Sequence, residues 1–322
     1  MKKFTLPKKP LLSIVTPSFN SGKYLEECIK SILSQDYPRV EHIIQDGAST
    51  DGITKKVLRK FKTSKYKHRI HIFSESDNGQ SDGLNKAIQK AKGDILLVLN
   101  ADDCLLPHAA SWAIENFRKY PNIAVVYGDV YTIDERSAII DIFKAHEFSF
   151  EKLLAVELVP PAQAAFIRRQ ALEKVGFNAD VTLDTCPDFE MWVRIAQKFP
   201  MKHVVGIVTK YRHHDKPQHD SGQRRTTQRF VKAKREVMDR LFNDPKTPHY
   251  IKRLRRRAYA SLYLWASYTA YDLGQTKQAV LYLVKSFILM PTLHKLWKIF
   301  KELRGFLRYR LTLLIKSIKH AL

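Results

Sequence analysis

Short apolar runs alternate with amphipathic helical patterns over the first 128 residues of the chain. The runs are rich in β-branched residues, and between them apolar residues recur every three to four positions, as in helices that bury one face. The run at 94–99 is almost wholly apolar, as expected of a strand that is covered on both faces. The pattern predicts strands at 11–16, 40–45, 69–73, 94–99 and 123–128, and helices at 22–34, from Thr50 or Asp51, and at 81–92.

Strands that alternate with helices imply right-handed crossovers and a mostly parallel sheet. Further along, the pattern predicts a helix at 187–199, a strand near 203–209 and almost only helix from 223 onward. We therefore expect an α/β domain over 1–222, with a mostly parallel central sheet flanked by helices, and an all-helical C-terminal region over 223–322. Residues 268–291 read as a helical hairpin similar to one tetratricopeptide unit, although one unit makes no array and a packed helical subdomain is the alternative.

Charge distinguishes the two regions. Residues 223–322 contain 23 Lys and Arg against 5 Asp and Glu, whereas residues 1–222 contain 32 against 27. A strongly basic region attracts phosphate groups of nucleic acids or anionic lipids. Within it, residues 292–320 place Trp, Phe and Leu at helical spacing among Lys and Arg, the pattern of an amphipathic helix in a membrane interface. A packed helix with a solvated basic face is the alternative reading of that segment.

We expect an anionic membrane surface as the partner of this region and no nucleic acid, since no recognised nucleic-acid module appears. No stretch reaches about 18 consecutive apolar residues, and the first apolar run is too short for a signal peptide. The three cysteines lack metal-ligand spacing, and their odd number argues against a disulfide framework. The sequence thus predicts a cytoplasmic protein, peripheral on the inner face of a membrane. The cysteines are Cys28, Cys104 and Cys186.

Polar and mostly acidic residues follow four of the predicted strands. In an open parallel sheet, ligands bind at the carboxyl ends of the strands, so these residues share one edge. Carboxylates repel one another unless a cation lies among them, and Mg²⁺ commonly takes one or two carboxylates together with substrate phosphates. Such a metal neutralises the charge of a departing diphosphate. Helix caps and turns are the other reading of the segments 16–20, 46–52, 75–82 and 100–103.

Five segments stand out in order along the chain: IVTPSFN (14–20), IIQDGASTDG (43–52), ESDNGQSDGLNKAI (75–88), GDILLVLNADD (93–103) and PDFEMWVRIA (187–196). Together they resemble the inverting glycosyltransferases of family 2, whose nucleotide-sugar-binding fold is the Rossmann-like GT-A fold. The resemblance covers about residues 11–215. It implies a hexosyltransferase-type enzyme (EC 2.4) that moves a sugar from a nucleotide-diphosphate sugar to an acceptor hydroxyl.

The same resemblance implies the partners of the reaction. It implies Mg²⁺ or Mn²⁺ as the cofactor and a glycan or lipid-linked saccharide as the acceptor, in bacterial envelope polysaccharide synthesis. We expect a UDP-sugar as the donor, with guanosine and thymidine as the other candidate nucleosides.

Individual residues take roles by the resemblance. Asn100 stands first in the family's DxD metal motif, which leaves Asp102 as the metal ligand, Asn100 to orient ribose or water, and Asp103 to hold the loop. Arg212 and His214 would close over the diphosphate, with His214 as a second metal ligand. The other residues expected around the nucleotide and donor are Pro17, Phe19, Asn20, Asp46, Asp77, Gly79, Lys86 and Ala101.

Asp188 is the predicted general base. It follows Pro187, which suits a first helical position, and a carboxylate in the first turn is favoured in its ionised form by the helix dipole. An ionised carboxylate at the rim of the site can take the proton of the acceptor hydroxyl as that hydroxyl attacks the anomeric carbon, with inversion. Asp184 is the alternative base.

Three other functions remain as alternatives. A nucleotidyltransferase would need a Gly-rich, Arg-bearing phosphate loop after the first strand, where this chain has TPSFN (16–20). A non-catalytic helical-repeat adaptor would not need Asp102 and Asp188 in these contexts. A nucleic-acid binder would show a steep salt dependence and no turnover of nucleotide sugars.

Overall fold

The computed structural model describes residues 4–177, 180–183, 185–214 and 227–292. Contacts divide these residues into two compact units, each described here by itself. The first unit holds 4–150, 159–177, 180–183 and 187–214, and the second holds 151–158, 185–186 and 227–292. The predicted base alternative Asp184 and all but the first residue of the predicted interfacial helix at 292–320 lie outside the described residues.

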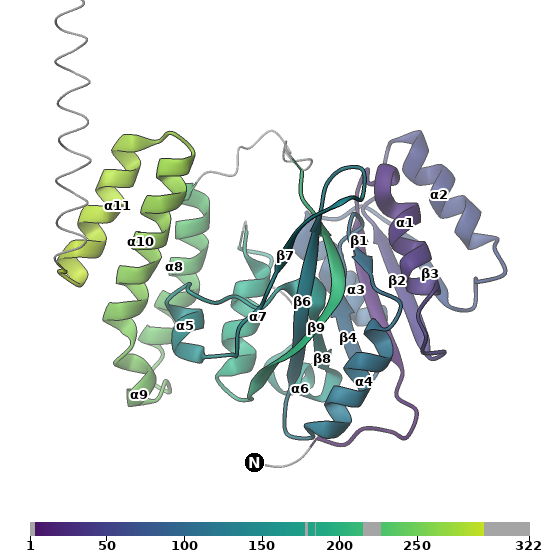
Figure 1. Cartoon of the computed structure of the whole chain (residues 1–322), viewed down its shortest axis with the longest axis horizontal. Helices are drawn as coiled ribbons and strands as arrows, with labels where there is room; N and C mark the ends of the chain where they lie inside the picture. The colour runs from purple at the N-terminus through teal and green to yellow at the C-terminus, as the bar shows by residue number, and fades with distance from the viewer. Residues whose placement is uncertain (1–3, 178–179, 184, 215–226, 293–322) are drawn as a thin grey trace, which may run out of the picture. The chain divides into compact units, whose positions relative to one another are not determined.

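The first unit is built on one mixed sheet (Figure 1). Its strands in the described residues are β1 (Leu12–Ser18), β2 (Val40–Asp46), β3 (Ile70–Ser74), β4 (Ile95–Val98), β5 (Cys104–Leu105), β6 (Val125–Ile133), β7 (Ile139–Phe143), β8 (Ala165–Arg168) and β9 (Met201–Arg212). The spatial order is β3-β2-β1-β4-β8-β6-β9-β5, and β7 pairs with β6. Strands β3, β2, β1 and β4 run parallel, whereas β8 is antiparallel to both of its neighbours.

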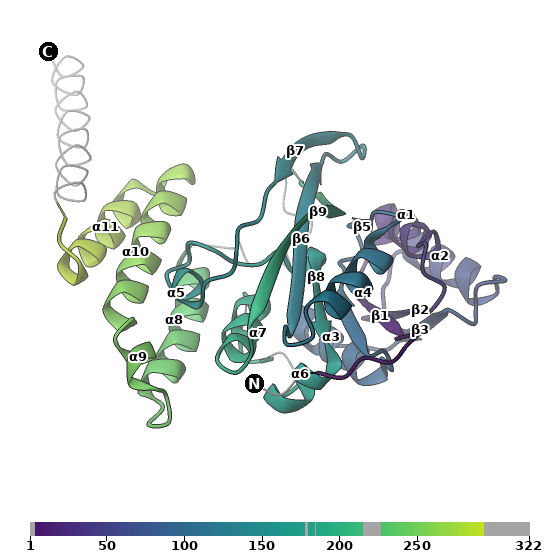
Figure 2. The same ribbon diagram turned by 60° about the horizontal axis from the view of Figure 1, so that its bottom comes forward.

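Helices flank this sheet (Figure 2). Helix α2 begins where the Asp51 carboxylate accepts a hydrogen bond from Thr54 N at 2.9 Å, a side-chain N-cap. One core cluster joins Leu25 and Ile29 to apolar residues of β2 and α2, and another joins β1, β4 and β8 to α4. The helices of this unit are α1 (Gly22–Leu33), α2 (Gly52–Lys62), α3 (Gln80–Lys90), α4 (Ala109–Lys119), α6 (Arg169–Val175) and α7 (Pro187–Ala196).

The α/β fold and the first four predicted strands are confirmed. The predicted strand at 123–128 belongs to a longer strand, β6, which pairs antiparallel with β8 and parallel with β9. Strand β7, IIDIF, lies at the edge with all five residues exposed, so it lacks the alternation that marks a half-buried strand.

The second unit is helical. It contains most of α5 (Phe150–Leu154) with α8 (Thr227–Asn243), α9 (His249–Lys252), α10 (Arg255–Asp272) and α11 (Thr276–Leu289). Helices α10 and α11 form a hairpin around Gly274, whose φ of +70° is in the left-handed region that glycine adopts without strain. Small buried residues let the two helices approach, and Ser286 Oγ donates to Ala260 O at 2.6 Å.

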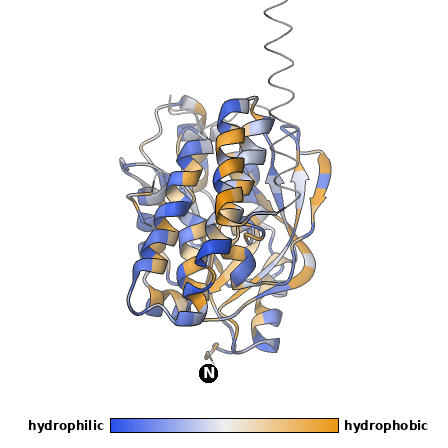
Figure 3. Ribbon diagram, turned by 90° about the vertical axis from the view of Figure 1, so that its left-hand side faces the viewer, coloured by the Kyte–Doolittle hydropathy of each residue, from blue (hydrophilic) through white to orange (hydrophobic). Residues whose placement is uncertain are grey.

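Hydrophobic and hydrophilic residues are interspersed along the helices of this unit (Figure 3). Leu281 and Ile288 of α11 are exposed, while Ala279, Tyr282 and Leu283 of the same helix are buried. Within the described ranges, no helix combines the length and the apolar character needed to cross a bilayer.

Candidate active site at the carboxyl ends of the strands

The loop after β1 is tied to the start of α2 by Asn20. Its amide oxygen accepts hydrogen bonds from Thr50 N at 2.9 Å and Asp51 N at 3.2 Å, and its backbone N donates to Ser49 Oγ at 2.8 Å. This arrangement holds Asn20 at a φ of 50°, an uncommon value for a residue other than glycine. On the same loop Phe19 is half exposed, and Pro17, near the end of β1, is half-buried.

Asp46, at the end of β2, is buried and fully engaged. Its carboxylate accepts hydrogen bonds from Ser49 N at 3.1 Å and from Ser74 Oγ at 2.7 Å, with a further short one from Ser49 Oγ. Only 1% of the residue is exposed. In this arrangement Asp46 organises the loops that follow β2 and β3.

Asp77 lies against two glycines that the sequence reasoning missed. A Cβ on Gly47 would come within 2.5 Å of Asp77 Oδ2, and a Cβ on Gly83 within 2.9 Å. Both distances are shorter than the contacts that Cβ atoms make in proteins. Residues 47 and 83 must therefore be glycine as long as the Asp77 side chain keeps its present position. The signal was present in the sequence, because Gly47 follows Asp46 directly and Gly83 begins the second turn of α3. Nearby, Gly79 has a φ of 106°, and its backbone N donates a hydrogen bond to Asp77 Oδ1 at 3.0 Å.

Lys86 lies on α3, half-buried. Its Nζ donates to Ser76 O at 2.8 Å and forms an ion pair with Asp82 at 3.1 Å. These contacts fix the loop between β3 and α3 from its helical side.

The loop at 100–103 is held by buried hydrogen bonds. Asp103 is fully buried, and its two carboxylate oxygens accept from Arg212 N at 3.0 Å and Asn100 Nδ2 at 3.1 Å. Burial raises the pKa of the Asp103 carboxyl well above its usual value, and the neighbouring Asp102 charge raises it further. Ala101 packs into the apolar cluster that includes residues of α1 and α2. Of the two carboxylates in the loop, Asp102 is the less buried, with 19% of its side chain exposed.

Asp102 and His214, 112 positions apart, are brought together. Asp102 Oδ2 lies 2.8 Å from His214 Nε2, with exposed side-chain fractions of 19% and 12%. The other ring nitrogen, Nδ1, is buried without a hydrogen-bond partner among the described residues and lies 3.9 Å from Glu135 Oε1. No cluster of three or more His, Cys, Asp or Glu suited to a metal occurs in the described part of the chain.

One carboxylate and one imidazole fit a divalent cation whose remaining ligands are diphosphate oxygens and water, because Mg²⁺ usually takes few protein ligands. The donor set of Asp102 and His214 is therefore compatible with Mg²⁺ or Mn²⁺, and a cation between them would replace their direct contact.

Arg212 holds the backbone of Asp102 and so helps to position the pair of Asp102 and His214. Its side chain is wholly buried, and its Nε donates to Asp102 O at 3.0 Å. The two Nη atoms donate to Asp134 O and Ser137 Oγ, both at 2.9 Å, and to Glu27 Oε2 at 2.7 Å. The guanidinium also lies 4.1 Å from the centre of the Tyr24 ring, a cation–π contact.

The sequence reasoning missed the partners in this network. Tyr24 and Glu27 lie three positions apart on one face of α1, and that spacing was the available signal. Glu135 and Ser137, in the turn between β6 and β7, carried no recognisable pattern.

Asp188 is half-buried in the first turn of α7, and its Oδ1 accepts from Phe189 N at 2.8 Å. The helix is anchored by Trp192, which is fully buried and donates from Nε1 to Pro160 O at 3.2 Å. A largely buried ion pair within the same helix joins Glu190 and Arg194 at 2.8 Å. Asp188 is thus the second residue of a helix that these contacts hold in place.

Comparison with known proteins identifies a matching family model and a related protein of known name. Residues 13–176 match the family model of Glycosyl transferase family 2. Over 201 residues the chain is 29% identical to chondroitin synthase of Escherichia coli, a match that covers 62% of this chain and 28% of that protein. The chain therefore spans less than a third of that relative's length.

Two solved structures share the fold. TarS residues 1–349 of S. aureus, in complex with UDP-GlcNAc, align with a TM-score of 0.67 at 16% identity, covering 87% of this chain and 82% of that one. The mannosyltransferase PcManGT of Pyrobaculum calidifontis, in complex with GDP-Man and Mn²⁺, aligns with a TM-score of 0.61 at 17% identity, covering 98% and 88%.

Proposed function

The chain belongs to glycosyltransferase family 2, a family of sugar-transferring enzymes, and from this premise we propose that it is an inverting, metal-assisted enzyme acting on a nucleotide-diphosphate sugar. The observation that carries the proposal is the contact between Asp102 and His214 at the strand-end edge, beside the loops that Asn20, Asp46 and Asp77 hold in place. Pro17, Phe19, Gly79, Lys86, Asn100 and Ala101 complete the proposed donor site.

Asp102 and His214 would hold Mg²⁺ or Mn²⁺. A cation held by these two residues would supply positive charge for the departing diphosphate. Arg212 keeps the Asp102 backbone in place, and through its own backbone N it also holds Asp103. Support for a metal and a nucleotide sugar comes from PcManGT, bound to GDP-Man and Mn²⁺, and from TarS, bound to UDP-GlcNAc.

Asp188 is the proposed general base. The first turn of α7 favours its ionised form, and the carboxylate accepts the proton of the acceptor hydroxyl while that oxygen bonds to the anomeric carbon and the bond from that carbon to the diphosphate breaks. A single in-line displacement inverts the configuration of the sugar.

The proposed acceptor is a glycan or lipid-linked saccharide in the synthesis of an envelope polysaccharide. Support for this class comes from the likeness to chondroitin synthase. An anionic membrane surface is the proposed location, supported by the excess of cations in the second unit, where residues 227–292 contain 13 Lys and Arg against 4 Asp and Glu.

The test is a panel of UDP-, GDP- and dTDP-sugars, each assayed for hydrolysis and for thermal stabilisation with and without Mn²⁺. We expect one donor to stabilise the protein only with the metal, by about 2.7 kcal/mol at a hundredfold excess over Kd. Stabilisation by no nucleotide sugar, or equal turnover in a chelator, would contradict the proposal.

A further inference from the structure

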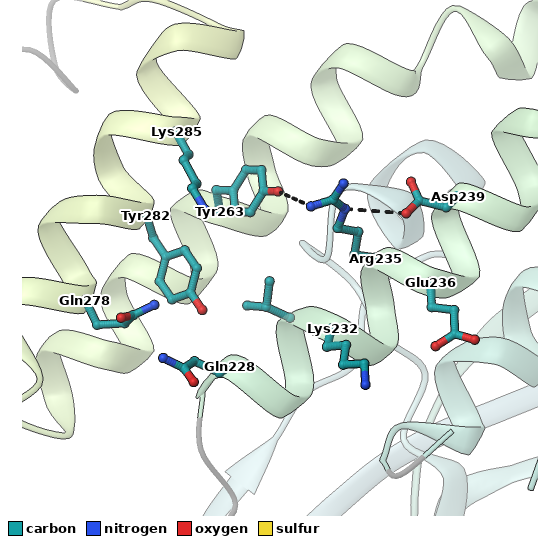
Figure 4. A pocket seen from close by; sticks show the side chains of 10 residues that line it. Gln228, Lys232, Arg235, Glu236, Asp239, Tyr263, Gln278, Tyr282 and Lys285 are labelled. Carbon is teal, nitrogen blue, oxygen red and sulfur yellow. Dashed lines mark hydrogen bonds and ion pairs between the residues drawn. The ribbon is translucent and has the colours of Figure 1, made fainter. Parts of the chain in front are cut away.

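A pocket of about 470 Å³ lies in the helical unit, among α8, α10 and α11 (Figure 4). Its volume is in the range of small-molecule sites. Val231, Tyr263 and Tyr282 are buried at its inner side, and the two tyrosine rings stack with their centres 6.1 Å apart. The remaining lining residues are polar: Gln228, Lys232, Arg235, Glu236, Asp239, Gln278 and Lys285.

The two acids of the pocket are already neutralised by arginines. Arg235 pairs with Asp239 at 3.4 Å, and Arg240 pairs with Glu236 at 2.5 Å. Lys232 and Lys285, both exposed, form no ion pair among the described residues, although Lys285 Nζ lies 5.6 Å from the Tyr263 ring centre. The rim therefore has two cations available to an incoming anion.

Hydroxyl-binding groups gather at one end of the pocket. In Figure 4 the side-chain amides of Gln228 and Gln278 lie near the Tyr282 hydroxyl. Amide and phenol groups both donate and accept hydrogen bonds, as sugar hydroxyls do. This chemistry suits a compact polar ligand with one acidic group.

We propose that this pocket binds an acidic saccharide unit of the acceptor glycan, with its hydroxyls at Gln228, Gln278 and Tyr282. Its carboxylate or phosphate would lie between Lys232 of α8 and Lys285 of α11, whose exposed side chains stand on opposite sides of the pocket (Figure 4). The identity of the ligand as acceptor rests on the proposed function, whereas the pocket itself does not.

The experiment is isothermal titration of the full chain with a glucuronate-containing tetrasaccharide, with maltotetraose as the uncharged comparison. We expect the acidic sugar to bind and maltotetraose to bind at least tenfold more weakly. Lys232→Gln removes a rim cation, and Tyr282→Phe removes only a hydroxyl and keeps the ring. Each should weaken binding about tenfold, because each removes a hydrogen bond, charged in the first case.

Lys277→Gln is the matched control, since Lys277 is an exposed cation of α11 that does not line the pocket. Equal weakening by Lys277→Gln and Lys232→Gln would overturn the proposal in favour of diffuse charge attraction. Binding to vesicles with anionic headgroups but not to the tetrasaccharide, lost in the same pocket variants, would overturn it in favour of a lipid. Binding of neither probe would reject the site.

Donor hydrolysis separates this inference from the proposed function. The pocket variants should hydrolyse the nucleotide sugar at the wild-type rate, because the pocket residues belong to the second unit and the proposed donor site to the first. A chain that turns over its donor but does not bind the acidic sugar would contradict only the pocket assignment. A chain that binds the acidic sugar but turns over no nucleotide sugar would contradict the proposed function alone.

Discussion

The strand-end site of the first unit and the pocket of the second unit hold their charges in opposite ways. Asp103 and Arg212 are fully buried, and several hydrogen bonds fix each of them. In the pocket, Lys232, Arg235 and Lys285 are exposed. Buried charges are costly to leave unpaired, whereas exposed ones are screened by water. Single substitutions should therefore have large effects at the strand-end site and small effects on stability around the pocket.

The largest effect is expected at the metal position. Asp102→Asn keeps a hydrogen-bond acceptor for His214 but removes the charge that would hold the cation. We expect kcat/KM to fall about 10³-fold, corresponding to several kcal/mol of charge stabilisation in the transition state. Steady-state kinetics across a Mn²⁺ titration would measure this, and an unaffected variant would remove Asp102 from the metal site.

Next comes the proposed base. Asp188→Asn should lower kcat by about 10²–10⁴-fold and leave donor affinity nearly unchanged, because the carboxylate acts on the acceptor proton. Single-turnover kinetics and donor titration separate the two quantities. If donor affinity falls and kcat does not, Asp188 is a binding or folding residue.

Arg212 tests stability at the same edge. Arg212→Gln should lower the free energy of unfolding by about 3–5 kcal/mol, because buried partners lose their donors. Arg136→Gln is the control, since Arg136 is exposed in the turn that follows β6. Urea unfolding monitored by circular dichroism measures both variants, and similar midpoints would show that the Arg212 network contributes little.

A smaller effect is expected on the stability of the protein at acidic pH. His42, in β2, is buried against Thr16 Oγ1 at 2.9 Å, and burial lowers its pKa from 6.5 to about 3. Between these values the unfolded chain binds the proton and the folded chain does not, so stability falls as the pH drops below 6.5. We expect a loss of about 2 kcal/mol between pH 6.5 and pH 5 from this residue.

The difference in unfolding free energy between wild type and His42→Leu should therefore shrink over that range. A constant difference would show that folding leaves the pKa of His42 unchanged. In the described part of the second unit the sequence contains only one histidine, His249, and it is exposed, so a comparable loss is expected of the first unit alone.

The smallest effect is expected in the second unit. Lys277→Gln should change the free energy of unfolding by no more than about 0.5 kcal/mol, as is usual for exposed side chains. Urea midpoints measure this change. A loss near that of Arg212→Gln would abolish the contrast between the two regions.

Local patterns predicted the parallel half of the sheet well. Strands β1 and β4 are rich in apolar residues because both of their faces are buried, and such burial leaves a signature in the sequence. Strand β2 is buried at every position as well, although it contains Glu41, His42, Gln45 and Asp46. The family resemblance, now confirmed, rests on the strand-end segments that follow these runs.

What the sequence could not provide are contacts between distant positions. Glu27 and Arg212 form an ion pair although they lie 185 positions apart in the sequence. No residue near either of them in the sequence indicates that the two side chains will be in contact. Strand β8 joins the sheet between β4 and β6 with only four residues, too few to distinguish a strand from a buried helical turn. Pairing of this kind is decided by the assembled sheet, and no local propensity encodes it.

The composition of the second unit has a consequence for how the protein is made. Residues 151–158 belong to that unit together with α8, α10 and α11, and Glu151 and Glu157 both pair with Arg257. At about 5–20 residues per second, a ribosome needs roughly 5–20 s to add the hundred or so residues that separate these partners. During that interval the early segment emerges without the helices it packs with. A nascent chain released too soon would carry this segment uncovered, so α8, α10 and α11 are needed to cover residues that are made before them.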